Sequence, residues 1–213
     1  MSEQRGKFIV FEGIDGSGKS TVSAAIHAWM LSLDEPVHKT FEPTDGPIGS
    51  VIRNVLKHRI VADEKTIGAM FVADRLDHIL NNENGMLKYL NRGTHVICDR
   101  YYYSSYAYHV PYLSLDYVIQ ANSVCADLLR PDLVIYLKIT PEISMDRIGK
   151  NRSSSDLFET KERITQVFNN YEKAIAREGH SDNVKIIDAS KPLEEVINEV
   201  KILIQDELMM LNK

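Results

Sequence analysis

Short runs of apolar and β-branched residues recur along the chain, separated by longer stretches in which apolar residues return every three or four positions. Short apolar runs with little polar alternation predict strands buried on both faces, and the longer spacing predicts helices that cover them. The predicted strands span residues 7–12, 37–41, 95–99, 132–138 and 184–188. Because strands and helices alternate, the pattern predicts a three-layer α/β fold with a five-stranded parallel sheet and helices on both faces.

Local signals mark where several of these helices begin. A helix follows the first strand over residues 21–33, and Asp63 is a capping residue in front of another helical stretch. Thr140 followed by Pro141 favours a third helix start, because proline is tolerated in the first turn. Pro192 opens the last helix in the same way.

One stretch departs from the alternation. Residues 149–156 are polar and rich in serine, between two helical segments. They predict either a solvated loop or a short mobile lid, over about residues 149–158, whose basic residues reach a bound phosphate. The chain has no internal repeat, low-complexity linker or domain boundary, so we expect a single domain over residues 1–213.

The composition narrows the possible functions. The 213 residues carry a net charge of −5, which argues against a surface built to coat nucleic acid. An acidic protein that handles phosphates must concentrate its cations in one pocket. Cys98 and Cys125 have no metal-like spacing, so we expect two buried thiols in a reducing compartment. The start of the chain lacks the apolar core of a signal peptide, and no apolar run reaches the ~20 residues of a membrane span, so a cytoplasmic protein is expected.

Residues 13–20, with the sequence GIDGSGKS, match the phosphate-binding pattern G-x-x-x-x-G-K-[ST] at every fixed position. A predicted strand precedes this loop and a predicted helix follows it, which is the order that a P-loop requires. Glycines let the backbone N–H groups point at phosphate oxygens, and the helix N-terminus adds partial positive charge. The residues expected around the phosphates of ATP are Gly13, Ile14, Asp15, Gly16, Ser17, Gly18, Lys19, Ser20 and Thr21.

Four residues of this region carry the predicted chemistry. Lys19 brings a cation to the β- and γ-phosphates, and the Ser20 hydroxyl ligates Mg²⁺. Asp99 ends the third predicted strand, where it either joins the metal shell or caps the following turn. Arg100 either neutralises that aspartate or places a cation beside the transfer site, and we favour the second role.

Several sequence blocks together carry a family resemblance. They are FEGIDGSGKST at residues 11–21, EPT at 42–44, FVADR at 71–75, DRYYYSSYAY at 99–108 and RPDL at 130–133. In this order and spacing they resemble the thymidylate kinases, and the resemblance covers about the whole chain. It implies the P-loop NTPase fold, ATP and Mg²⁺ as cofactors, a homodimer, and the reaction ATP + dTMP to ADP + dTDP.

The resemblance also implies a lid-arginine enzyme. Gly16 follows Asp15, so the P-loop offers no arginine for catalysis. Arg152 is then the expected catalytic arginine of the lid, with Arg147 in reserve. The other residues expected to act in catalysis are Asp15, Lys19 and Arg100.

Residues of the family's base pocket are implied at matching positions. Phe71 would lie against the pyrimidine, and Arg75, one helical turn on, would donate to the base carbonyl that cytosine replaces with an amino group. Without the family, these two residues would more often be a helix packing pair. Ser104 and Ser105 would contact the base edge or organise the loop, and Glu42 belongs to the Glu-Pro turn after the second strand.

The remaining implied contacts concern the sugar and phosphate of the acceptor. Asp15 would approach the 3′-hydroxyl, and Tyr108 would fill the space of a ribose 2′-hydroxyl. Arg53 and Arg100 would bind the 5′-phosphate. The four other tyrosines of residues 101–106 are expected in the core or on the surface.

Three features of the sequence depart from the family pattern. Residues 44–46 read Thr-Asp-Gly where two glycines and a threonine are common, and Phe41 stands where bacterial relatives often have arginine. His109 replaces a frequent glutamine, which leaves its contact with substrate open.

Two rival functions follow from the same residues. One is a P-loop kinase for another nucleoside monophosphate or a deoxynucleoside, since a fold does not fix its substrate. The other is a nucleotide-dependent switch or binding module without catalysis, which the intact set of P-loop and Asp-Arg residues disfavours. The chain also lacks the guanine-reading Asn-Lys-x-Asp of a GTPase.

Overall fold

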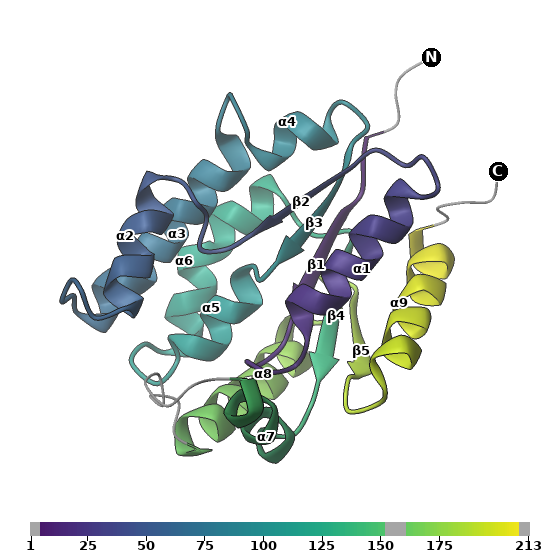
Figure 1. Cartoon of the computed structure of the whole chain (residues 1–213). Coiled ribbons are helices and arrows are strands. Elements are labelled where there is room, and N and C mark those ends of the chain that lie inside the picture. The colour runs from purple at the N-terminus through teal and green to yellow at the C-terminus, as the bar shows by residue number, and fades with distance from the viewer. Residues whose placement is uncertain (1–4, 152–160, 209–213) are drawn as a thin grey trace.

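The computed structural model describes residues 5–151 and 161–208 and has a five-stranded parallel sheet (Figure 1). The strands are β1 (Phe8–Glu12), β2 (Val37–Phe41), β3 (His95–Asp99), β4 (Leu133–Lys138) and β5 (Val184–Asp188). Their order across the sheet is β2-β3-β1-β4-β5, and all four pairings are parallel. The five predicted strands are therefore confirmed to within a residue at each end.

Burial follows position in the sheet. Every residue of β1 is buried, because β3 and β4 flank it and helices cover both faces. The edge strands β2 and β5 are only partly buried. This gradient explains why the central strands read as continuous apolar runs.

The helices lie in two layers. On one face α1 packs against α9, and on the other face α5 packs against α6 and α8 (Figure 1). The connection from β1 to β2 runs toward the β2 edge of the sheet, whereas the other three connections run toward the β5 edge. Because such crossovers are right-handed, α1 lies on the opposite face from the helices of the other connections. The helices are α1 (Lys19–Leu31), α2 (Pro47–Leu56), α3 (Glu64–Leu80), α4 (Met86–Leu90), α5 (Tyr102–Tyr108), α6 (Leu115–Leu128), α7 (Pro141–Asn151), α8 (Lys161–Glu178) and α9 (Leu193–Leu208).

The helix starts predicted at Asp63, Pro141 and Pro192 hold. The Asp63 carboxylate accepts from the Lys65 N–H at 2.9 Å and caps α3, and α7 and α9 begin at Pro141 and directly after Pro192. Two boundaries were wrong. The first helix runs over Lys19–Leu31, two residues earlier at each end than predicted, because it begins within the P-loop pattern itself. Residues 149–151, assigned to the polar loop, continue α7, because no proline or capping residue interrupts the helix there. The rest of the expected lid, Arg152 included, lies outside the described residues.

Two further expectations concern the whole described chain. Cys98 and Cys125 are both free thiols and both buried, as predicted. Among residues 5–151 and 161–208 there is no helix long and apolar enough to cross a membrane.

Candidate active site

The loop between β1 and α1 forms a closed cradle. Its first glycine, Gly13, has a φ of 147°, and a Cβ there would lie 2.7 Å from the Leu137 carbonyl oxygen. Gly16 and Gly18 have φ values of 75° and 90°, which side-chain-bearing residues rarely adopt. The sequence folds this way because only glycine permits these backbone turns in so tight a space. The loop then passes directly into the N-terminus of α1.

Lys19 lies inside this cradle. Its Nζ donates to the carbonyl oxygens of Gly13 and Ile14, each at 2.9 Å. Burial, and then the nearby Arg100 cation, lower the pKa of Lys19 to about 7. A polyanion bound beside Nζ would offset both effects, so the cradle favours a phosphate ligand.

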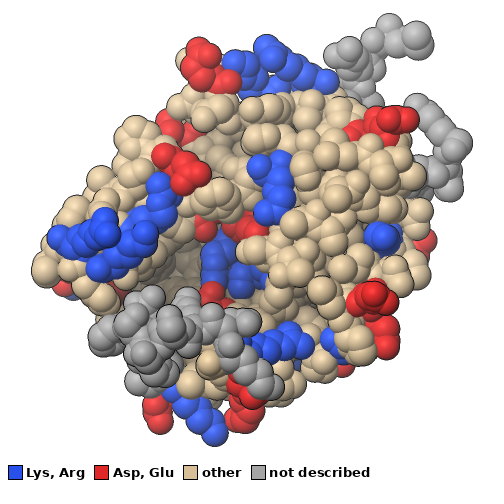
Figure 2. Space-filling view, viewed as in Figure 1, with Lys and Arg blue, Asp and Glu red and all other residues tan. Residues whose placement is uncertain are grey.

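A cavity of about 590 Å³ opens above the cradle. Figure 2 shows Lys and Arg atoms in a hollow at the centre of this face, which fits the expectation that an acidic protein gathers cations in one pocket. The residues that line the cavity are Asp15, Gly16, Ser17, Gly18, Lys19, Ser20, Thr21, Val22, Arg100, Arg147, Ala189, Lys191, Leu193 and Val196. Seven of the nine predicted P-loop residues are among them.

Asp15, Arg100 and Tyr108 meet at one side of the cavity. The Arg100 guanidinium forms an ion pair with the Asp15 carboxylate, and the Tyr108 hydroxyl donates to the other Asp15 oxygen at 3.2 Å. The guanidinium carbon lies 5.1 Å from the centre of the Tyr108 ring. The loop after β1, the residue after β3 and the end of α5 thus bring three of the predicted site residues together. Arg100 adopts a φ of 69°, an uncommon conformation for a residue with a side chain.

Asp99 lies at the carboxyl end of β3, beside Phe11 of β1. Its Oδ2 lies 3.4 Å from the Lys39 Nζ, and its Oδ1 is buried without a hydrogen-bond partner among the described residues. A buried carboxylate oxygen of this kind needs a donor or a cation. Ser20, in the first turn of α1, lines the cavity with its neighbours, whereas Asp99 is not among the lining residues. These oxygen donors fit Mg²⁺, held directly or through its water.

Glu12 was missed as a functional residue. Its buried carboxylate accepts from two backbone groups, the Tyr101 N–H at 2.7 Å and the Ser104 N–H at 3.1 Å. It also accepts from two hydroxyls, that of Ser104 and that of Tyr171 at 2.9 Å. Burial raises the pKa of Glu12, although these donors and Arg100 oppose it. The contacts tie β1 to the start of α5, the helix that carries Tyr108. A charged residue at the end of an apolar strand was the only sequence signal.

The two serines of α5 are both buried and both make side-chain contacts. Ser104 accepts from Arg100 Nη1 at 3.2 Å and donates to Glu12, while Ser105 accepts from Arg75 Nη1 at 3.2 Å. Of the two roles predicted for these serines, the contacts fit organisation of the loop.

Arg75 and Glu42 form a second cluster behind the base-pocket positions. Arg75 is 1% exposed, and its Nη2 lies 2.6 Å from Glu42 Oε2. Its Nη1 also donates to Asn122 of α6, a residue that the sequence did not single out. These partners of Arg75 thus lie in the turn after β2 and on α5 and α6 rather than at Phe71, and its contact with a base stays a prediction.

Phe71 and Arg53 have different surroundings, Phe71 beside His109 and Arg53 at the turn after β2. The Phe71 ring is half-buried, 5.1 Å from the His109 ring and tilted by 57°. Arg53 donates to the carbonyl oxygens of Pro43 and Thr44 and pairs with Asp45 at 3.3 Å. Arg53 thereby holds the turn, and neither residue lines the P-loop cavity.

His109 gives a pH-dependent prediction. Burial, and then Arg75 and Arg163, lower the pKa of His109 to about 4. In the unfolded chain His109 has an ordinary pKa near 6.5 and binds a proton that it does not bind in the folded chain. The free energy of unfolding therefore falls as the pH drops below about 6.5. We expect His109 to account for about 2 kcal/mol of the loss between pH 7 and pH 5. Denaturant titration of His109→Gln should show a smaller loss, while the exposed control His180→Gln should match the wild type. Equal losses in all three proteins would contradict the assignment.

The sheet order, the cradle before α1 and the acid at the end of the neighbouring strand define the class: a P-loop nucleotide-binding protein built for phosphoryl transfer. The thymidylate kinase profile matches residues 11–200, and the chain belongs to the thymidylate kinase family. A Bacillus pumilus protein named thymidylate kinase is 35% identical, over 95% of this chain and 97% of its own length. A Pyrococcus horikoshii relative, called "Probable thymidylate kinase", is 34% identical over 96% and 98%. The Plasmodium falciparum thymidylate kinase is 31% identical over 93% and 89%.

Proposed function

We propose that the chain transfers the γ-phosphoryl group of ATP to the 5′-phosphate of dTMP, giving ADP and dTDP. An acceptor phosphate oxygen forms the new P–O bond while the bond to the ADP oxygen breaks. The observation that carries the proposal is the meeting of Asp15, Arg100 and Tyr108 beside the Lys19 cradle. This arrangement gives a donor site and an acceptor site on one cavity.

The proposed roles follow from charge and position. The P-loop N–H groups and Lys19 hold the β- and γ-phosphates, and Arg100 binds the acceptor phosphate. Ser20 and Asp99 are the proposed holders of Mg²⁺, which when bound neutralises phosphate charge. Phosphoryl transfer needs little covalent participation from the protein, so positioning and charge account for catalysis.

The acceptor's sugar and base are proposed to lie beyond Asp15. Asp15 accepts from the 3′-hydroxyl, and Tyr108 excludes a 2′-hydroxyl because its half-buried ring occupies that space. Phe71 stacks on the pyrimidine and Arg75 reads its carbonyl, from the position that its ion pair with Glu42 fixes.

Arg147 supports the choice of Arg152 as the catalytic arginine of the lid. Arg147 Nη2 donates to the Ala189 carbonyl oxygen at 2.9 Å, and Nη1 lies 3.4 Å from the Gly16 oxygen. These contacts hold it beside the P-loop and the loop after β5, where it would contact the donor nucleotide. We expect Arg152→Ala to lower kcat far more than it raises KM for dTMP, and Arg147→Ala mainly to raise KM for ATP. Steady-state kinetics of both variants measure this, and the reverse pattern would reassign the roles.

A coupled assay of ADP release tests the function. The acceptors are dTMP, dUMP, UMP, CMP, AMP and thymidine, each with ATP and Mg²⁺. The proposal expects dTMP to have the highest kcat/KM and thymidine to be inactive, since it lacks the phosphate that Arg100 binds. Preference for another monophosphate or for thymidine would establish the rival kinase, and turnover of none would favour a switch or binding module.

Assembly and location are also proposals. A homodimer is expected from the family, and sedimentation at several protein concentrations tests it. We propose a reducing, cytoplasmic setting on the basis of the two buried free thiols. The net charge of −5 supports a small-molecule substrate rather than nucleic acid as partner.

A further inference from the structure

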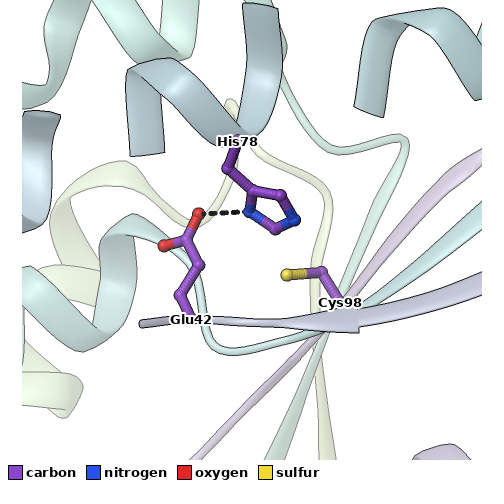
Figure 3. A group of neighbouring side chains, drawn as sticks. All are labelled: Glu42, His78 and Cys98. Carbon is purple, nitrogen blue, oxygen red and sulfur yellow. Dashed lines mark hydrogen bonds and ion pairs between the residues drawn. The ribbon is translucent and has the colours of Figure 1, made fainter. Parts of the chain in front are cut away.

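Glu42, His78 and Cys98 form a buried cluster between β2, β3 and α3 (Figure 3). One potential ligand atom from each lies within 4.8 Å of the other two, an arrangement that resembles a metal site. The cluster is already satisfied without a metal. Both nitrogens of His78 have partners, and the Cys98 thiol donates to the Arg100 carbonyl oxygen at 3.1 Å. Burial, followed by Glu42 and Asp99, raises the pKa of the Cys98 thiol, so a thiolate ligand is disfavoured.

The positively charged group that this cluster contacts is the Arg75 guanidinium. Its Nε donates to Glu42 Oε2 at 2.8 Å, and its Nη2 lies 2.6 Å from the same oxygen. A second positive charge beside this guanidinium would be repelled. The cluster is therefore a polar network built around an arginine, and its geometry bears on what that arginine can do.

Arg75, at one end of the network, sets the direction of its hydrogen bonds. Glu42 pairs with Arg75 and so accepts only, which requires the proton of His78 to lie on Nδ1, 3.1 Å from Glu42 Oε1. In the neutral ring Nε2 is then an acceptor, and the Thr40 hydroxyl, 2.7 Å away, donates to it. The chain runs from Thr40 through His78 and Glu42 to Arg75. One carboxylate oxygen is thereby held by His78 and the other by Arg75.

This arrangement fixes the direction of the guanidinium. Contacts with Glu42, Ser105 and Asn122 engage Nε–H, both Nη1 hydrogens and one Nη2 hydrogen. The second Nη2 hydrogen is the donor that the described residues do not engage. Its direction depends on the Glu42 carboxylate, and the carboxylate depends on His78, which lies three residues after Arg75 on α3. Without His78, Glu42 Oε1 loses its Nδ1–H donor, and among the described residues the carboxylate that orients Nε and Nη2 is held by Arg75 alone.

We propose that His78 is a positioning residue that sets pyrimidine specificity by orienting Arg75 through Glu42. The proposal rests on the proposed function, in which Arg75 reads the base carbonyl. A histidine at this position acts without touching the substrate, because it is buried behind the ion pair. It restricts the donor to one direction, and a wrongly placed donor discriminates poorly between bases.

Three variants test the network by kinetics with dTMP and dCMP. His78→Leu removes both hydrogen bonds, His78→Asn keeps an N–H near the position of Nδ1, and Thr40→Val removes only the hydroxyl that fixes the ring. We expect His78→Leu to lower the dTMP-to-dCMP ratio of kcat/KM about tenfold, mainly through KM for dTMP. His78→Asn should recover most of the ratio, and Thr40→Val should lie between them. Ratios at the wild-type value in His78→Leu would overturn the proposal.

A double-mutant cycle separates positioning from general damage. In an Arg75→Ala background, His78→Leu should leave the ratio unchanged, because the residue through which it acts is gone. A further fall of the same size in that background would mean that His78 acts by another route, and the proposal would fail.

A readout without substrate separates this proposal from the proposed function. The Arg75 Nε–H hydrogen, followed through its ¹⁵N NMR signal, should exchange slowly with solvent in the wild type and in His78→Asn, and fast in His78→Leu. An unchanged signal in His78→Leu overturns the positioning role whatever the kinetics show. If the signal responds but Arg75→Ala keeps the wild-type ratio, Arg75 does not read the base, and the specificity role falls with that part of the proposed function.

Discussion

Lys19→Ala is expected to lower kcat by about 10³-fold or more, the largest loss from a single substitution in the described chain. The Nζ lies inside the cradle, held by the Gly13 and Ile14 carbonyl oxygens, where the phosphates of ATP would meet it. Its charge is most useful as negative charge shifts toward the ADP oxygen in the transition state. Alanine leaves the glycine backbone of the loop intact, so kcat should fall more than ATP binding weakens.

The folded state should tolerate this change. Burial disfavours the charged form of Lys19, so removing it relieves a desolvation cost and offsets the two lost hydrogen bonds. The melting temperature of Lys19→Ala should stay within a few degrees of the wild type, about the shift that 1 kcal/mol gives. Lys185→Ala is the matched control, since Lys185 is a partly exposed lysine on the edge strand β5 that pairs with Glu207. A tenth of wild-type activity in folded Lys19→Ala would refute the role of the cradle.

Local patterns carried the prediction of the fold and of the first half of the site. The P-loop could be read because its spacing is imposed by backbone geometry over eight consecutive residues, Gly13 to Ser20. The central strands could be read because burial on both faces leaves a continuous apolar run. Arg100 could be placed beside the transfer site because it directly follows a strand that neighbours β1 in the parallel sheet.

The residues that were missed depend on contacts distant in sequence. Glu12 meets Ser104 across 92 residues, and Arg75 meets Asn122 across 47. No periodicity within one element signals such a pair, because each partner satisfies a local pattern by itself. His78 carried no signal in the sequence, since its partners lie on β2 and in the turn after it. The packing of α3 against the sheet creates this network, and its members became visible only with the fold.

Arg100 gives the second large effect that we expect. Replacing it should lower kcat/KM for dTMP about 10²- to 10³-fold, because it is the one arginine that both lines the cavity and pairs with Asp15 in the described part of the chain. The loss should fall on both kcat and KM, since the guanidinium is proposed to bind the acceptor phosphate before and during transfer.

The backbone of Arg100 allows this loss to be separated from damage to the fold. Its φ of 69° costs roughly 1–2 kcal/mol for a residue with a Cβ and almost nothing for glycine. The ion pair with Asp15 is partly exposed and contributes at most about 1 kcal/mol. Arg100→Gly should therefore be as inactive as Arg100→Ala but more stable than that variant, because glycine adopts the positive φ without the cost of a Cβ.

This combination is the signature of a residue kept for function at a strained position. Arg177→Ala, which removes a surface arginine paired with Asp116, should leave both activity and stability close to wild type. Urea titrations of the three variants and the wild type, with kinetics on the same preparations, decide the matter. If Arg100→Gly is less stable than Arg100→Ala, the backbone holds no strain that glycine relieves, and if both are less stable than the wild type, the contacts of the guanidinium outweigh the strain and Arg100 is a structural residue as well. If Arg100→Gly retains wild-type kcat/KM, the cation beside Asp15 does not bind the acceptor phosphate.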